Sequence, residues 1–265
     1  MSRFQHAFNI GAFLTFSLAV PSRAEIPDQA ATKLLKQVSQ KYAAAKRYAF
    51  EGTLDVARQI REDPQDVLAK ATVKLEFAPG GKFLLHIKNE NDKSEYSLIS
   101  DGRKSWAYVP SFAKYTERDA TTAANDVKLP DTQYLPAGDL PEGKADTAEQ
   151  FARQIMPLLA GLEKNAQTSF LRGMVLQVVS KKDPKDTQDH QTLAYLNVNT
   201  STLVIFHLTW IQHGLHKNEK ALIRADFKFT DLRINDQVPD TDFSFSPPAG
   251  AELVESLQIP GRAGL

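Results

Sequence analysis

The chain has 265 residues, of which 42% are hydrophobic and 24% charged, and its 32 basic residues balance its 32 acidic residues. This balance argues against nucleic acid as a partner, because binding to a phosphate backbone needs a concentrated basic surface. The chain has no cysteine, which excludes disulfides, thiolate metal sites, a cysteine nucleophile and a lipid-modified cysteine.

Residues 1–24 have the three parts of a secretory signal. Arg3 gives the positive start, an apolar run covers residues 10–20, and Ser22 and Ala24 are small residues at the two positions that a signal peptidase reads. The run is shorter than the roughly 20 apolar residues of a membrane span. We therefore expect cleavage after Ala24, a periplasmic location and one mature domain at residues 25–265. The alternative is an amphipathic N-terminal anchor that stays attached.

The mature chain begins with a predicted helix over residues 27–46, in which Leu34, Leu35, Val38 and Tyr42 form one apolar stripe. After this helix the apolar period changes to two, which predicts half-buried strands. The predicted strands cover residues 48–56, 72–77, 83–88, 96–99, 105–109, 170–180, 192–198, 203–211, 221–232 and 243–245. Short turns such as Gly80-Gly81 join them, so we expect antiparallel neighbours.

Two segments interrupt the strand pattern. Residues 119–145 contain three prolines and two glycines without any apolar period, which predicts a long loop. Residues 146–167 predict a helix, with Thr147 and Gln150 in capping-box spacing and with Pro157 expected to kink or split it. We expect residues 119–167 to form a mobile lid, and its apolar face is predicted to contain Phe151, Ile155, Leu158, Leu159 and Leu162.

The predicted fold is mainly β (α+β), with more sheet than the two helices can cover. A helix is about 10 Å wide and strands lie about 4.8 Å apart, so two helices cover roughly four or five strands. Because nine or ten strands are predicted, the remaining apolar face must close as a barrel or half-barrel. Such a shape leaves a cavity where side chains do not fill it. A fully packed β-sandwich is the alternative.

Two motifs resemble those of the LolA-type outer-membrane lipoprotein carriers. Residues 100–110 (SDGRKSWAYVP) are similar to the family's serine-aspartate-glycine and tryptophan-x-tyrosine-x-proline pattern, and residues 243–250 (FSFSPPAG) to its closing phenylalanine-x-phenylalanine-x-proline-proline-x-glycine strand. The order of elements runs in parallel from about residue 30 to residue 254. The resemblance implies a single curved antiparallel sheet forming a half-barrel. It also implies that the N-terminal helix and a mid-chain lid helix cover the sheet and that lipoprotein acyl chains lie between sheet and lid.

The apolar phase of the early strands gives the predicted lipid-binding residues. They are Tyr48, Phe50, Val73, Leu75, Phe83, Leu85, Ile87, Tyr96, Leu98, Trp106 and Tyr108. Aromatic residues such as Trp106 and Tyr108 also suit ordinary core or stacking on a sugar. Where the carriers have an arginine-proline pair whose arginine closes the lid, this chain has Ala78-Pro79. We therefore expect a lid that rests ajar, with Arg103 and Arg118 as the alternative residues for closure.

We expect a binding protein rather than an enzyme. His207, His213 and His216 are close in sequence, but such spacing on a strand is common by chance, and no metal or cofactor is expected. The expected partners are acyl chains of a lipid or lipoprotein and membrane-bound donor and acceptor proteins, with the chain itself a monomer. Two alternatives stay open: a sensory module like that of RseB-type regulators, which have an additional C-terminal domain, and a packed interaction domain without cargo.

Overall fold

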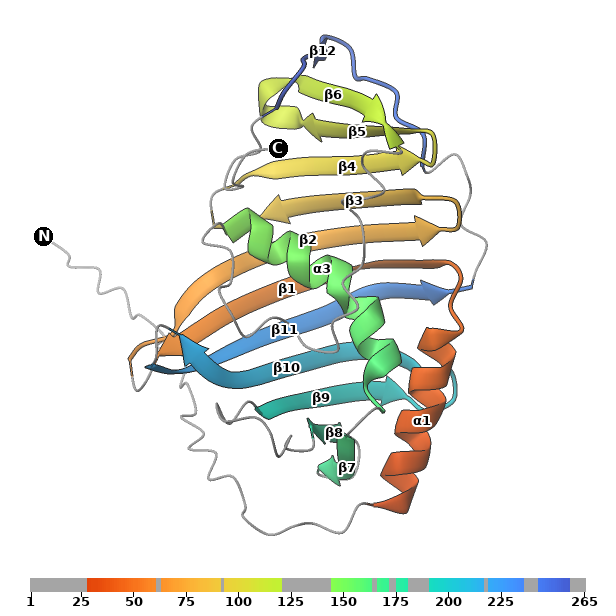
Figure 1. The fold of residues 1–265 in the computed structure, drawn as a ribbon, viewed down its shortest axis with the longest axis vertical. Coiled ribbons are helices and arrows are strands. Elements are labelled where there is room, and N and C mark those ends of the chain that lie inside the picture. Colours follow the sequence, from red (N-terminus) through yellow and green to blue (C-terminus); the bar gives the residue numbers. More distant parts are fainter. Residues whose placement is uncertain are drawn as a thin grey trace, which may run out of the picture.

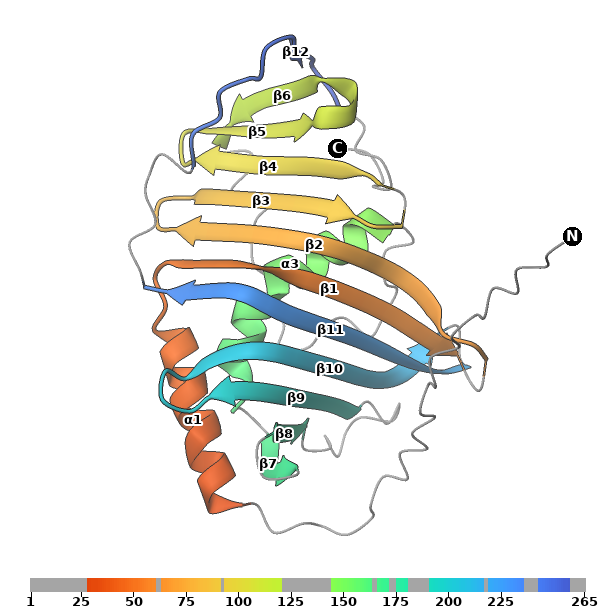
Figure 2. The same ribbon diagram turned by 180° about the vertical axis from the view of Figure 1, so that it is seen from behind.

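A computed structural model describes residues 28–60, 63–91, 93–120, 144–163, 166–171, 175–180, 191–216, 219–235 and 243–257. These residues form one large, open, curved sheet of 12 strands together with two α-helices (Figures 1 and 2). The strand order is β12-β6-β5-β4-β3-β2-β1-β11-β10-β9-β8-β7, and neighbouring strands are antiparallel except for β12 and β6. The prediction of a single curved antiparallel sheet with two helices is confirmed.

The helices and strands follow one another along the chain in a simple order. They are α1 (Gln29–Ala43), β1 (Tyr48–Ile60), β2 (Asp66–Ala78), β3 (Lys82–Asn89), β4 (Glu95–Asp101), β5 (Lys104–Val109), a 3₁₀ turn (Pro110–Phe112), β6 (Lys114–Asp119), α3 (Lys144–Gly161), β7 (Ala166–Leu171), β8 (Val175–Ser180), β9 (Gln191–Asn199), β10 (Val204–His216), β11 (Glu219–Ile234) and β12 (Glu252–Leu253). None of the helices in the described ranges is long and apolar enough to cross a membrane.

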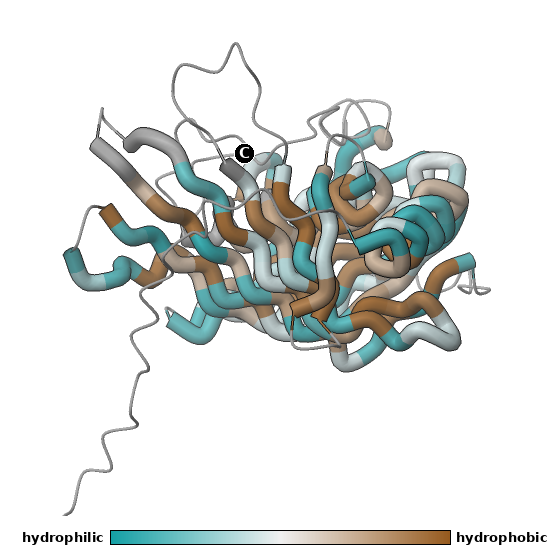
Figure 3. Tube along the Cα trace, turned by 90° about the horizontal axis from the view of Figure 1, so that it is seen from below, coloured by the Kyte–Doolittle hydropathy of each residue, from teal (hydrophilic) through white to brown (hydrophobic). Residues whose placement is uncertain are grey.

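Alternating apolar residues give the sheet two different faces, as the hydropathy along each strand shows (Figure 3). Residues that pair directly across neighbouring strands point to the same face. The pairs Phe50 with Leu75, Leu75 with Leu85, Leu85 with Leu98, and Leu98 with Ala107 therefore carry one apolar face across β1, β2, β3, β4 and β5. We call this the inner face, because α3 lies on it (Figure 1).

Two tight turns at the same end of the early strands fix their register. Gly80 and Gly81 join β2 to β3, and Gly102 joins β4 to β5, all with positive φ. A Cβ atom built on Gly102 would lie 2.2 Å from the carbonyl oxygen of Gly80. Only glycine allows the two turns to approach this closely, which explains physically the glycine of the SDG motif.

Several sequence predictions differ from the structure. The segment 170–180 is not one strand, because β7 and β8 pair antiparallel, with Phe170 opposite Leu176. Strand β6 was missed, and residues 243–245 form no strand. The predicted helix 146–167 ends at Gly161, since β7 already begins at Ala166, and it continues through Pro157 without splitting. The predicted signal segment and most of the predicted long loop lie outside the described residues.

Helix α1 follows its predicted stripe. Asp28 caps it by accepting hydrogen bonds from the backbone nitrogens of Ala30 and Ala31. Leu35, Val38 and Tyr42 are buried, and Leu34 is half-buried. The helix packs against α3 and β7, which places it at one end of the inner face.

Candidate functional site

Helix α3 covers the inner face with a continuous apolar stripe. Phe151, Ile155 and Leu159 are spaced four residues apart and are buried, as are Ala152 and Met156 beside them. The helix contacts β1, β2 and β3, and Figure 1 shows it crossing the sheet diagonally. All five predicted lid residues belong to the hydrophobic cluster that includes the inner face, with Leu158 half-buried and with Leu162 buried just after the end of α3.

The predicted lipid-binding residues of the first four strands share the inner face. Their register pairs agree, since Tyr48 lies opposite Phe77, Phe77 opposite Phe83, and Ile87 opposite Tyr96. Phe83 is half-buried and the others are buried. The nine residues thus brought together are Tyr48, Phe50, Val73, Leu75, Phe83, Leu85, Ile87, Tyr96 and Leu98.

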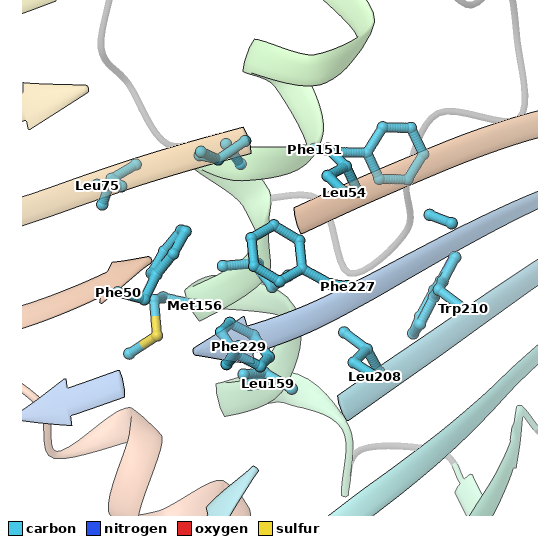
Figure 4. Close-up of a cluster of buried hydrophobic side chains, with 14 of the residues drawn as sticks. Phe50, Leu54, Leu75, Phe151, Met156, Leu159, Leu208, Trp210, Phe227 and Phe229 are labelled. Carbon is cyan, nitrogen blue, oxygen red and sulfur yellow. The ribbon is translucent and has the colours of Figure 1, made fainter. Parts of the chain in front are cut away.

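The other half of the inner face was not predicted as part of the site. Phe227 and Phe229 of β11 lie 4.5 Å apart between ring centroids, and Phe50 meets both edge-on at 5.3 and 5.8 Å (Figure 4). Leu208 and Trp210 continue the face on β10. A sequence signal was available, because these residues alternate within the predicted strands 203–211 and 221–232.

Among the described residues, the side chains of α3 and of the inner face pack against one another in a single hydrophobic cluster. One cavity, of about 10 Å³, lies there. A cavity of this size holds at most about one water molecule. An acyl chain would fit at this cavity only if α3 moved away from the sheet. The cavity is lined by Leu54, Phe151, Gln154, Ile155, Leu158, Leu208, Trp210, Ala225 and Phe227.

Polar contacts hold the N-terminal half of α3 on the sheet. The hydroxyl of Tyr96, on β4, donates to Oε2 of the buried Glu149 at 3.2 Å. Arg153 donates from Nε to Oε1 of Glu149 at 2.9 Å, and its guanidinium lies 5.4 Å from the ring centroid of Phe83. We call these four residues the α3 clamp. Burial raises the pKa of the neighbouring Tyr48, and the charge of Arg153 lowers it in part.

The C-terminal half of α3 is held by α1. Ser39 donates from its hydroxyl to the carbonyl oxygen of Leu159 at 3.3 Å, within the buried contact of the two helices. Also on α1, the hydroxyl of Tyr42 accepts a hydrogen bond from the backbone nitrogen of Ile205 at 3.1 Å. Burial raises the pKa of Tyr42 to about 12, although the bond to Ile205 lowers it in part. Helix α1 thus links α3 to β10.

Trp106 and Tyr108 do not lie on the inner face. Ala107 pairs with Leu98, so the residues on either side of Ala107 point to the opposite, outer face. There Phe245 packs against both rings, at 6.0 Å from Trp106 and 5.7 Å from Tyr108, and against Tyr115 at 5.4 Å. The two predicted residues are therefore separated from the other nine and serve to anchor the C-terminal segment.

The side chain at position 78 does not face the predicted lid helix. Ala78 is fully buried on the outer face, where it packs with Ala49 and Phe243, because it is one residue out of phase with Phe77. A side chain at this position points away from α3. Arg103 is exposed in the turn between β4 and β5, and Arg118 is exposed on β6. Among the described residues of the predicted lid, Arg153 of α3 contacts the sheet at Phe83, and α3 packs on the inner face. Residues 121–143 lie outside the described residues, and the resting position of the whole lid stays a prediction.

The histidine cluster considered in the sequence lies on the outer face at His207. Its Nε2 is 3.6 Å from Oδ1 of Asp226. The same Oδ1 accepts a hydrogen bond from the hydroxyl of Thr209 at 2.6 Å, and Oδ2 of Asp226 lies 2.6 Å from Nε of Arg224. Burial raises the pKa of Asp226, but these three neighbours lower it to about 2. In the described ranges no group of three or more His, Asp or Glu side chains is placed to bind a metal ion.

No protein-family model and no curated protein matches this chain. Solved structures that resemble it include a LolA superfamily protein from Nitrosomonas europaea, at 11% identity and a TM-score of 0.32, covering 83% of this chain and 99% of that chain. LprF from Mycobacterium bovis has 8% identity and a TM-score of 0.40, covering 81% and 98%. The MucA/MucB complex of Pseudomonas aeruginosa has 12% identity and a TM-score of 0.30, covering 82% and 61%. The family suggested by the two motifs is thus among the matches.

Proposed function

We propose that this protein binds the acyl chains of a lipid or lipoprotein between α3 and the inner face, without catalysing a reaction. The observation that carries the proposal is the contact itself: an amphipathic helix lies with an apolar stripe on the apolar inner face of an open sheet. A ligand inserted here would meet apolar side chains on both sides. The proposed setting is the periplasm, and the proposed process is lipoprotein trafficking between membrane-bound donor and acceptor proteins.

Binding at the cavity between α3 and β10 would require α3 to separate from the sheet, since this cavity measures about 10 Å³. Burial of an acyl chain contributes about 0.8 kcal/mol per methylene group, or roughly 12 kcal/mol for a chain with about 15 methylenes. The stripe of α3 would stay buried in the complex, because the acyl chain would replace the sheet as its packing surface. The main cost is therefore the rupture of the α3 clamp and of the direct packing.

A packed interaction domain without cargo is the second candidate, and the small size of the cavity favours it. The two candidates differ in what happens when an apolar ligand is supplied. In the packed domain α3 stays in place, whereas in the acyl-binding protein α3 is displaced and the ligand becomes protected from water. In the RseB-like alternative the ligand also displaces α3, and the protein additionally binds a partner protein.

Titration with a fluorescent fatty-acid probe separates these candidates. The Leu158→Gln variant places an amide in the interior contact at a half-buried position, so it changes the site with less damage to folding than a charge at the buried Leu85. Thr53→Gln, which faces outward on β1, is the matched control. We expect saturable binding by the wild type and by Thr53→Gln, and binding at least tenfold weaker by Leu158→Gln. Equal affinity in all three would contradict a site under α3.

A further inference from the structure

One of the side chains that line the cavity under α3 carries a buried polar atom without a hydrogen-bond partner. Trp210 of β10 is only 5% exposed, and its Nε1 is buried without a hydrogen-bond partner in the described structure. Buried donors are normally paired, so an unpaired indole N–H beside a cavity needs an explanation. The other polar side chain that lines this cavity is Gln154 of α3, which is 9% exposed.

The second tryptophan of the chain shows how such a group is ordinarily satisfied. Nε1 of Trp106 donates to Oε2 of Glu117 at 3.0 Å on the outer face. Trp210 lies instead among apolar residues, including Leu54, Leu208 and Phe227. Because the Trp210 side chain lines the cavity, this unpaired donor belongs to a residue of the inner face that a ligand under α3 would contact.

The chemistry of the cavity selects the kind of acceptor that fits. An indole N–H is a donor only, so its partner must offer an oxygen lone pair. A charged carboxylate is disfavoured, because it would be buried among apolar side chains with no cation lining the cavity. Arg153, which precedes Gln154 on α3, already pairs with Glu149. A neutral carbonyl oxygen satisfies the donor without this desolvation cost.

We propose, building on the acyl-binding function above, that Trp210 donates its indole N–H to the neutral ester or amide carbonyl of an acylated ligand. Gln154 supplies the second polar contact from α3. The cavity of about 10 Å³ is the place at which the carbonyl is seated once α3 has moved. The site therefore prefers acyl esters and amides, the linkages of glycerolipids and lipoproteins, over free fatty acids and alkanes.

Proton NMR of the Trp106→Phe protein tests this assignment without changing Trp210. This variant retains one indole N–H signal, because the chain has two tryptophans. The probes are methyl palmitate, palmitate and hexadecane, which share an acyl-length tail and differ in the polar end. We expect methyl palmitate to shift the indole N–H signal downfield and hexadecane to leave it near its free position.

Affinities for the same probes provide a second measurement. We expect the Trp210→Phe protein to lose about tenfold in its preference for methyl palmitate over hexadecane, which corresponds to about 1.4 kcal/mol. If the ester binds without a downfield shift, or if wild-type protein does not distinguish the ester from the alkane, the Trp210 assignment is wrong while acyl binding stands. If none of the three probes binds, acyl binding itself is refuted. When methyl palmitate binds, a comparison of dipalmitoylglycerol with a dipalmitoylated lipopeptide distinguishes a glycerolipid from a lipoprotein as the source of the ester.

Discussion

The hydrogen bond between Tyr96 and Glu149 can be removed by deleting one oxygen atom. Tyr96→Phe keeps the ring, which is 0% exposed under α3, and deletes the hydroxyl that donates to Glu149 at 3.2 Å. Glu149 keeps its pairing with Arg153. The variant therefore weakens the α3 clamp without leaving the carboxylate unpaired.

The expected effect follows from the charge of the acceptor. A hydrogen bond to a charged group contributes about 1.5–3 kcal/mol, and the remaining Arg153 contact places this one at the lower end of that range. A loss of about 1.5 kcal/mol makes separation of α3 from the sheet roughly tenfold more frequent.

Hydrogen exchange of the α3 backbone amides measures this directly. Exchange through local opening tracks the free energy of that opening, so amides at positions 149–159 should exchange roughly tenfold faster in Tyr96→Phe. Tyr108→Phe makes the same chemical change on the outer face and should leave these rates unaltered. Equal exchange of α3 in both variants and the wild type would refute the view that this contact holds α3 closed.

Three further predictions concern stability and are measured by urea unfolding. Burial raises the pKa of Asp226, but its neighbours lower it to about 2. A carboxyl whose pKa is lower in the folded state than its unfolded value near 3.9 stabilises the fold above that value, so about 2 kcal/mol of the free energy of unfolding should be lost between pH 5 and pH 2. The Asp226→Asn variant should lack this pH dependence. Phe227→Ala should cost about 3–5 kcal/mol because it opens a void beside the cavity, whereas Phe112→Ala, at a residue 50% exposed, should change stability by less than about 0.5 kcal/mol. Gly102→Ala should cost more than about 1 kcal/mol, because its φ is +89° and its Cβ would meet a carbonyl oxygen at 2.2 Å, while Gly161→Ala meets no atom and should cost nothing.

Alternation along the early strands was enough to predict their inner face. Val73, Leu75 and Phe77 repeat every second residue, and a pleated strand sends such residues to one side. The same rule places Ala78 on the outer face, so its proposed role in closing α3 conflicted with the sequence itself. The motif resemblance fixed the position of that alanine along the chain but carried no information on the direction of its side chain.

Other features depended on contacts between distant segments. In the run Ser105 to Val109 both phases are apolar, and the register with β4 decides that Ala107 faces inward. Phe245 then covers the outward Trp106, which no local pattern could indicate. The pairing of Glu149 with Arg153 is readable from their four-residue spacing on a helix. Its link to Tyr96 is a tertiary contact that becomes visible only when α3 is placed on the sheet.

The central claim is that apolar cargo binds between α3 and the inner face, and native mass spectrometry of the protein isolated from its own cells tests it most directly. Such spectra should show the polypeptide with an additional mass that tandem fragmentation identifies as an acylated lipid or lipopeptide. The Leu158→Gln protein, prepared in the same way, should carry less of it. A spectrum that contains only the bare polypeptide, unchanged after incubation with lipid or lipopeptide, would contradict the claim and leave the packed interaction domain as the better description.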